Sequence, residues 1–124
     1  MLKTGKFVIT KKSDAVFQFD YRDSNDTIIL YSGNYTRKMM CLNGIESVKR
    51  NSKDSFKFFK KTSQSGTFYF NLKSFNGKII AVSEFFENRS LRDNAIDLIK
   101  IEAVNASIED QSKLRKYSYA VDNE

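Results

Sequence analysis

The sequence predicts an α+β fold built from two tandem β-β-β-α repeats, and three observations support this. Residues 68–83 combine an alternating aromatic run, an Asn-Gly pair and a β-branched run, which is the pattern of a β-hairpin. A less regular copy of this hairpin lies at residues 17–32. Apolar residues at helical spacing follow each copy. The chain therefore repeats one unit of three strands and a helix.

A shift of 51 residues aligns the two copies without gaps. Among the residues it superposes are ten identical pairs, more than chance would give: Phe7/Phe58, Phe17/Phe68, Phe19/Phe70, Asn25/Asn76, Ile28/Ile79, Ile29/Ile80, Ser32/Ser83, Asn43/Asn94, Ile45/Ile96 and Lys49/Lys100. We expect one domain over 5–110, with repeats at 5–52 and 56–104 and a short strand near 106–110. Residues 111–124 show no apolar period and are expected to form a disordered tail.

Period-2 alternation defines the strands of the first repeat, which we expect near 7–10, 17–22 and 28–31. In the second of these strands, three aromatic residues share the face expected to be buried, namely Phe17, Phe19 and Tyr21. Three polar residues take the opposite face, namely Gln18, Asp20 and Arg22. By the same alternation in the second repeat, Phe68, Phe70 and Leu72 are expected to face the helices.

A covering helix is expected from about Thr36, as N-cap, to Arg50. Its apolar stripe is Cys41, Ile45 and Val48. Gly44 lies beside this stripe, where a glycine would let the helix approach the sheet closely. The second helix is expected over about 88–102, with Leu91, Ala95 and Ile99 in the stripe and Ala95 in the place of Gly44.

Composition limits the chemistry that is open to this chain of 124 residues. Charged residues make up 29% and the mean hydropathy is -0.50, values typical of a globular protein. No apolar run reaches the ~20 residues of a membrane span, and residues 1–6 lack the apolar core of a secretory signal, so a cytoplasmic location without membrane contact is expected. The chain has no histidine and one cysteine, Cys41, which is expected to be a small buried residue of the helix. We expect no enzyme activity, no metal and no cofactor.

Three segments resemble the YegP-like family of small bacterial proteins: residues 44–51 (GIESVKRN), residues 68–73 (FYFNLK) and residues 76–80 (NGKII). The resemblance covers about residues 5–110. It implies that both repeats join in one antiparallel sheet with pseudo-twofold symmetry, with both helices on one face and a C-terminal strand exchanged between the halves. The family also has single-repeat members that form homodimers. It implies no known activity and no catalytic residues.

The chain departs from the family pattern at two places. In the second helix, residues 95–102 lack the Gly and the Ser-Val of residues 44–48. In the first hairpin, Asn25-Asp26 stands where the second has Asn76-Gly77. A function that required these residues in both copies would therefore not be met here.

The sheet face without helices is the first candidate binding surface, because alternation directs a mixed set of polar and aromatic side chains toward it. Antiparallel sheets often have one solvated face without any ligand, so this pattern alone does not require a partner. If Phe59 and Tyr69 form an exposed pair there, that pair is the first place to look for a partner protein or a stacked base. The candidate residues are Arg22, Phe59, Lys61, Tyr69, Asn71 and Lys73, with Val8 and Gln18 on the same face.

Residues 49–61 form a second candidate, since basic side chains alternate there with aromatic ones. Residues 1–61 hold 13 Lys and Arg against 6 acids, whereas residues 62–124 hold 8 against 9, so the net charge of +6 comes from the first half. Such a surface suits single-stranded nucleic acid. It also suits a buried Phe58 with lysines that protect a sheet edge from aggregation.

Four carboxylates crowd the first hairpin, at Asp14, Asp20, Asp23 and Asp26, but their spacing lacks the Gly and final Glu of a calcium loop. A solvated turn is the better explanation, because Asp and Asn favour turns for local hydrogen-bonding reasons. The expected function is thus that of a non-catalytic structural or protein-interaction module, with low-specificity binding of single-stranded nucleic acid as the alternative. The partner is unknown, and a monomer is expected because one chain already contains two repeats.

Overall fold

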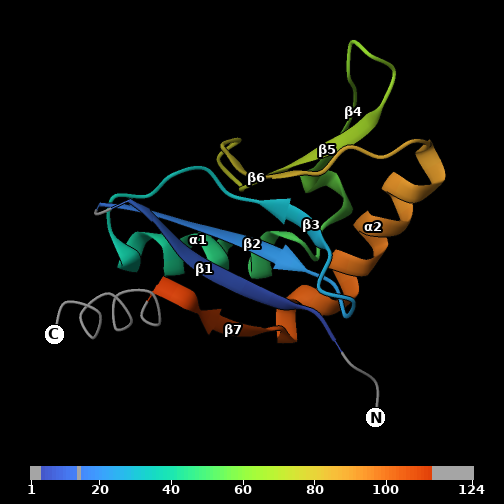
Figure 1. Cartoon of the computed structure of the whole chain (residues 1–124). Coiled ribbons are helices and arrows are strands. Elements are labelled where there is room, and N and C mark those ends of the chain that lie inside the picture. The colour runs from blue at the N-terminus through green and yellow to red at the C-terminus, as the bar shows by residue number, and fades with distance from the viewer. Residues whose placement is uncertain (1–3, 14, 113–124) are drawn as a thin grey trace, which may run out of the picture.

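Two β-β-β-α units and one additional strand make up the molecule (Figure 1). The computed structural model describes residues 4–13 and 15–112. The elements are β1 Lys6–Ser13, β2 Val16–Arg22, β3 Ile28–Tyr31, α1 Lys38–Asn51, η1 Ser55–Lys57, β4 Phe58–Thr62, β5 Phe68–Lys73, β6 Ile79–Ser83, α2 Arg89–Glu102, η2 Ala103–Asn105 and β7 Ser107–Asp110. The predicted α+β fold of two tandem repeats is confirmed.

All strands join one seven-stranded sheet in the order β4-β5-β6-β3-β2-β1-β7. The repeats meet where β3 and β6 pair antiparallel, through Leu30 with Ser83 and Tyr31 with Val82. β7 follows the second helix but pairs with β1 of the first repeat, and it does so in parallel. The sheet is therefore mixed: the expected antiparallel arrangement holds for six strands, and the exchanged strand is parallel.

The 51-residue repeat extends to individual hydrogen bonds beyond the strands. The backbone of Phe17 exchanges hydrogen bonds with that of Tyr35, and Phe68 does the same with Phe86. Two buried serines fill matching positions: the Phe19 N–H donates to Ser32 Oγ and the Phe70 N–H to Ser83 Oγ, each at 2.9 Å. The serine identity in the two repeats thus has a structural cause, since each hydroxyl pairs a buried backbone donor.

The two hairpin turns also match, although their sequences differ. Gly77 has a φ of +83°, and its counterpart Asp26 has a φ of +66°. Asp is one of the few residues with a side chain that enters this left-handed region, so Asn25-Asp26 forms the same turn as Asn76-Gly77. The departure from the family pattern at this hairpin therefore leaves its shape intact.

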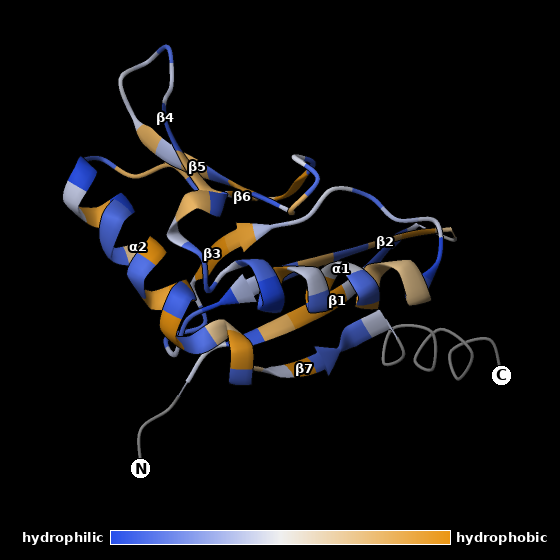
Figure 2. Cartoon of the chain, turned by 180° about the vertical axis from the view of Figure 1, so that it is seen from behind, coloured by the Kyte–Doolittle hydropathy of each residue, from blue (hydrophilic) through white to orange (hydrophobic). Residues whose placement is uncertain are grey.

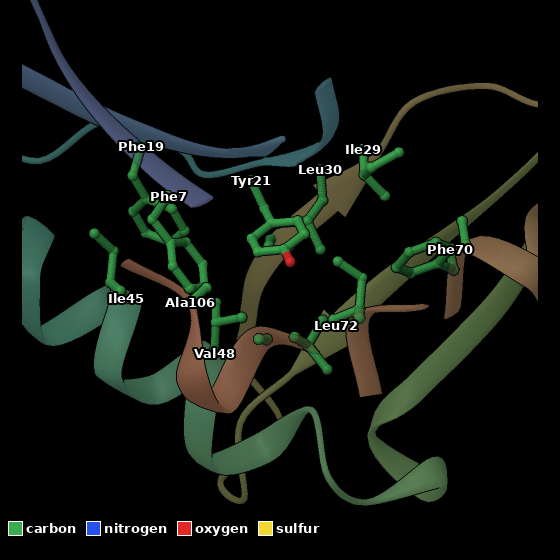
Figure 3. Packing of buried hydrophobic residues seen from close by; sticks show 14 of the residues in the cluster. Phe7, Phe19, Tyr21, Ile29, Leu30, Ile45, Val48, Phe70, Leu72 and Ala106 are labelled. Atoms are coloured by element: carbon green, nitrogen blue, oxygen red, sulfur yellow. The ribbon is translucent and has the colours of Figure 1, made fainter. Parts of the chain in front are cut away.

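Aromatic and aliphatic side chains fill the space between the sheet and the helices (Figure 3). Phe7 lies edge-on to Tyr21 and Phe19, with ring centroids 5.0 and 6.0 Å apart, and Phe58 lies edge-on to Phe70 at 5.6 Å. Along both helices apolar residues alternate with polar ones, as Figure 2 shows. The predicted stripe of α1, Cys41, Ile45 and Val48, is fully buried, and in α2 Ala95 and Ile99 are buried whereas Leu91 is 46% exposed.

The first helix begins later than expected. Arg37 is its N-cap and makes no side-chain cap hydrogen bond, so the prediction of Thr36 as N-cap is wrong. The reason is the bridge between Tyr35 and Phe17, which holds the chain extended up to this point. In the second repeat Asn88 is the N-cap, and its side chain accepts from the Leu91 N–H at 2.9 Å.

β7 continues into Gln111 and Ser112, which take a helical conformation. The Ser112 N–H donates to Asp110 Oδ1 at 3.0 Å, and Ser112 is buried. Residues 113–124, the rest of the predicted tail, lie outside the described residues.

Gly44 makes room for a side chain of the sheet layer. A Cβ built on Gly44 would meet Oη of Tyr35 and come within 3.0 Å of Cε2 of Phe19. In the second repeat the counterpart of Tyr35 is Phe86, which lacks the hydroxyl, and the counterpart of Gly44 is Ala95, which has the methyl group. Gly44 is therefore needed because a side chain there would collide with the Tyr35 hydroxyl. The glycine also allows the close approach of helix and sheet that the sequence predicted.

We expect Gly44→Ala to lower the free energy of unfolding by about 1–3 kcal/mol, because overpacking outweighs the better helix propensity of alanine. Gly44→Ala combined with Tyr35→Phe should recover about 1 kcal/mol relative to the sum of the single variants. Urea unfolding of the wild type and the three variants measures this coupling. Additive effects would show that the tyrosine hydroxyl does not set the requirement for glycine.

The buried Tyr21 links the first repeat to the end of the second helix. Its hydroxyl donates to Glu102 Oε1 at 2.9 Å, and the Gly5 N–H donates to the same oxygen at 3.1 Å. Burial, followed by the hydrogen bond and the charge of Glu102, raises the pKa of Tyr21 well above its usual value. At a pH above the usual tyrosine pKa of about 10, Tyr21 therefore stays neutral in the folded protein, whereas it ionises in the unfolded chain.

We expect Tyr21→Phe to lower the free energy of unfolding at neutral pH by about 1 kcal/mol, through loss of this hydrogen bond. Above about pH 10 the unfolded wild type gains stability by releasing the Tyr21 proton, so the wild type should lose stability faster than the variant and the difference should shrink. Urea unfolding from pH 7 to 11 measures both curves, with Tyr31→Phe on the exposed face as control. Parallel curves would contradict this assignment.

Candidate binding surface

The helix-free face of the sheet divides into two halves with different chemistry. Strands β4, β5 and β6 carry aromatic, apolar and lysine side chains on this face, whereas β1, β2 and β7 carry an ion-pair network. The alternation of side chains across the strands produces both halves, and pairing at β3 and β6 joins them.

We call the first half the aromatic patch and define it by Phe59, Lys61, Tyr69, Lys73 and Phe85. The ammonium group of Lys73 lies 4.0 Å from the ring centroid of Phe59. The rings of Tyr69 and Phe85 meet edge-on, with centroids 5.3 Å apart. Phe59 is 42% exposed and Phe85 is 59% exposed, so large apolar surface remains in water.

A row of paired residues extends the aromatic patch across four strands. Phe59 pairs with Asn71, Asn71 with Val82, and Val82 with Tyr31. Asn71 itself is buried, whereas Tyr31 is 38% exposed, and Ile79, which pairs with Lys73, is 54% exposed. The apolar surface thus continues from the β4 edge to the middle of the sheet.

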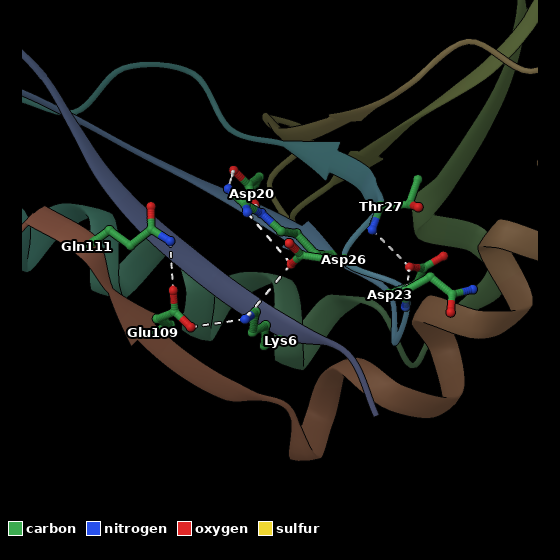
Figure 4. A network of polar contacts seen from close by, with 9 residues as sticks. Lys6, Asp20, Asp23, Asp26, Thr27, Glu109 and Gln111 are labelled. Carbon is green, nitrogen blue, oxygen red and sulfur yellow. Dashed lines mark hydrogen bonds and ion pairs between the residues drawn. The ribbon is translucent and has the colours of Figure 1, made fainter. Parts of the chain in front are cut away.

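The second half of the face is a charged network around β1 (Figure 4). Arg22 Nε binds Asp20 Oδ1 at 2.7 Å, and Lys6 Nζ binds Glu109 Oε1 at 3.0 Å. Hydrogen bonds from Gln111 and Lys6 lower the pKa of the Glu109 carboxyl. Val8 lies beneath this network, paired with Asp20 and Glu109 on either side, and is fully buried.

The structure separates the six candidate residues. It brings together Phe59, Lys61, Tyr69 and Lys73, places Asn71 below them, and sets Arg22 apart in an ion pair with Asp20. Sequence reasoning missed Phe85. Its signal was the alternation after β6: Phe86 repeats the inward Tyr35, so the preceding residue points the other way.

Residues 49–61 do not form one surface. Phe58 is buried in the core, as the alternative interpretation of this segment expected, whereas Phe56 is 87% exposed and Phe59 lies on the helix-free face. Lys49 donates to the Ala106 carbonyl at 3.0 Å, and Lys60 pairs with Asp93 at 3.2 Å. The alternation of basic and aromatic residues therefore reflects positions on different sides of the molecule.

The carboxylates of the first hairpin have local partners. Asp23 Oδ1 accepts from the N–H groups of Asn25 and Thr27 at 2.9 and 3.0 Å, and Asp20 binds Arg22. Asp14 lies outside the described residues. Across residues 4–13 and 15–112, no three Cys, Asp or Glu side chains come together as a metal site would require.

Cys41 is fully buried and unpaired, as expected for a small core residue. Burial raises the pKa of its thiol to about 11. Because the thiolate is the reactive form, this cysteine is a poor nucleophile at neutral pH.

In the described part of the chain, neither helix has the length and apolarity to cross a membrane.

Comparison with known proteins identifies the fold's family. The family described as "Domain of unknown function (DUF1508)" matches residues 13–55 and again 63–110. The chain belongs to this family. Each of the two DUF1508 matches covers most of one repeat. The predicted resemblance to the YegP-like family is confirmed by the relatives. The UPF0339 protein YegP of Escherichia coli K12 is 35% identical over 108 residues, which cover 87% of this chain and 98% of YegP.

Other proteins that this chain resembles also come from bacteria. A UPF0339 protein of Bordetella pertussis is 36% identical over 110 residues, covering 89% of this chain and 98% of the relative. The solution NMR structure of a UPF0339 protein from Shewanella oneidensis has a TM-score of 0.84 at 33% identity, covering 89% of this chain and 93% of that one. The structure of E. coli YegP, described as of unknown function, has a TM-score of 0.83 at 34% identity, covering 90% and 97%.

Proposed function

We propose that this chain is a non-catalytic protein-interaction module and that it binds its partner through the aromatic patch. The observation that carries the proposal is the exposure on the helix-free face of Phe59, which lies on β4, and Phe85, which lies in the segment after β6. Aromatic side chains on strands lose little conformational entropy on binding, and they are common at the energetic centres of interfaces. Lys61 and Lys73 in the patch favour a partner with carboxylates near its apolar groups.

The absence of catalysis is part of this proposal. The chain has no histidine, which is the commonest general base, and its one thiol is buried with a raised pKa. We further propose that the chain acts in the cytoplasm as a monomer. The pairing of β3 with β6 supports the monomer, because each repeat finds the strand partner it needs within the same chain.

A photo-cross-linking residue placed at Phe59 tests the interaction. In cells that express the protein naturally, we expect one discrete covalent adduct from position 59 and none from position 75. Phe75 is a matched control because it is 83% exposed but lies in the β5–β6 turn. Phe85→Ala should reduce the adduct by about fivefold or more, as truncation of an interface anchor does.

Since Phe85 is exposed, its truncation should leave thermal unfolding unchanged, and this is checked in parallel. Equal adducts from positions 59 and 75, or no adduct from position 59, would refute the role of the aromatic patch.

Low-specificity binding of single-stranded nucleic acid is the second candidate, and the placement of two lysines beside two exposed rings and the half-buried ring of Tyr69 favours it. Bases stack on aromatic faces while lysines contact phosphates. Lys73 already covers one face of Phe59, which leaves Tyr69 and Phe85 as stacking positions. This arrangement offers fewer free ring faces than a stacking platform would use, and we therefore rank it second.

Fluorescence anisotropy with short single-stranded RNA and DNA over a salt series separates the two candidates. Nucleic-acid binding would appear at low salt, and Lys61→Glu with Lys73→Glu would lower the slope of log affinity against log salt by about 1.4. Lys78→Glu, a single charge reversal in the β5–β6 turn, is the control and should leave the slope unchanged. If no binding occurs at low salt, the second candidate is excluded.

A further inference from the structure

We propose that the free edge of β4 binds an extended acidic segment of another protein as an added parallel strand. The two ends of the sheet differ: β7 pairs with β1 at one end, whereas β4 is the last strand at the other. The inference concerns this edge rather than the aromatic patch, so it holds or fails independently of the function proposed above.

β7 shows how such a strand is held. It is a short acidic strand, with the sequence SIED over Ser107–Asp110. Lys6 Nζ binds Glu109 at 3.0 Å, Lys38 Nζ binds Asp110 at 2.5 Å, and Lys49 Nζ bonds to the Ala106 carbonyl at 3.0 Å. Three cations therefore fix the start of β7 and its two carboxylates.

The second repeat carries a basic residue at each matching position. The 51-residue shift relates Lys6, Lys38 and Lys49 to Lys57, Arg89 and Lys100. Within the described ranges, none of these three counterparts forms an ion pair with a carboxylate. Lys100 donates to the Ser55 hydroxyl, and Ser55 is the residue that the 51-residue shift relates to Ala106, the partner of Lys49. Arg89 lies over the Phe68 ring. The cations of the β7 site are thus present beside β4, without an acidic strand.

The backbone of β4 is oriented to accept a strand. Phe68 exchanges both of its hydrogen bonds with Phe86, so alternation turns the N–H and C=O of Tyr69 toward Lys61. The same groups of Lys60 then point away from β5. In the first repeat the corresponding residue is Ile9, which pairs with β7. The edge of β4 therefore offers at Lys60 the hydrogen-bonding position that β1 uses at Ile9, whereas the N–H of Phe58, the counterpart of Phe7, donates to the Ser55 carbonyl in η1.

Within residues 4–13 and 15–112, the chain supplies no strand for this position. At the β1 end, the segment that follows α2 forms β7 and pairs with β1, and β1 is a separate segment near the start of the chain. At the other end, the segment that follows α1 passes through η1 and forms β4 itself, so it cannot also pair with β4. Lys60 and Lys61 discourage pairing with apolar or basic strands, whereas an acidic strand would find Lys57 and Arg89 on its two sides. Lys60 already forms an ion pair with Asp93, so the carboxylates of the docked strand would be bound by Lys57 and Arg89.

A synthetic peptide with the sequence of residues 103–112 is the probe, because this is the segment that pairs with β1. Titrated into the isotope-labelled full chain at about 50 mM salt, it should shift the amide signals of Lys60 and Thr62 and protect them from hydrogen exchange. Lys57→Glu combined with Arg89→Glu should weaken binding about tenfold, whereas Lys78→Glu, a single charge reversal in the β5–β6 turn, should not.

Two control peptides separate strand pairing from charge attraction. One control peptide carries Lys in place of Glu109 and Asp110. The other is methylated on the backbone nitrogen of Glu109, whose N–H faces β1 when this segment forms β7. Neither peptide should bind. The proposal is overturned if β4 amides do not respond, if the control peptides bind equally, or if β1 amides respond instead. Protection at β4 that rises with protein concentration alone would make a second copy the occupant and would also overturn it.

Discussion

The pairing of β3 with β6 is the contact on which the rest of the molecule depends. Each repeat ends its meander in a short strand with one edge left open, and an isolated three-stranded meander of this size has little core. When the two open edges meet, a single sheet results, and the two helices share one apolar layer against it. The exchange of β7 and the link from Tyr21 to Glu102 then tie the ends of the second repeat back to the first.

Local patterns predicted most of this architecture because the repeats carry redundant signals. Alternating Phe and Tyr residues located β2 and β5, and the helical stripe located α1. The turn at Asp26 could be read from Gly77, since the two positions match in the repeat. What local patterns could not give were long-range constraints. Because Tyr35 forms a bridge with Phe17, the first helix begins after Thr36. The sequence near Thr36 contains no signal for this bridge.

The candidate surface was harder to predict than the fold for the same reason. Alternation placed Val8 and Phe59 correctly on the helix-free face, but it could not say that Val8 is fully buried while Phe59 is 42% exposed. That difference depends on the neighbouring strand, because β7 flanks β1 and places Glu109 beside Val8. It also could not show that Arg22 would be engaged by Asp20, two residues away on the same strand.

Part of the identity between the repeats follows burial, although Asn25/Asn76 and Asn43/Asn94 are identical at exposed positions. The identical pairs Phe19/Phe70, Ser32/Ser83 and Ile45/Ile96 are buried, where a change of volume or a lost hydrogen bond is costly. On the helix-free face, by contrast, each residue of the aromatic patch differs from its counterpart: Val8 for Phe59, Thr10 for Lys61, Gln18 for Tyr69, Arg22 for Lys73 and Asn34 for Phe85. The β4 end combines exposed rings with a strand edge that is unpaired within the described residues, whereas at the β1 end β7 completes the sheet and the charges are paired. This difference between the two copies is why we propose that a partner binds at the β4 end.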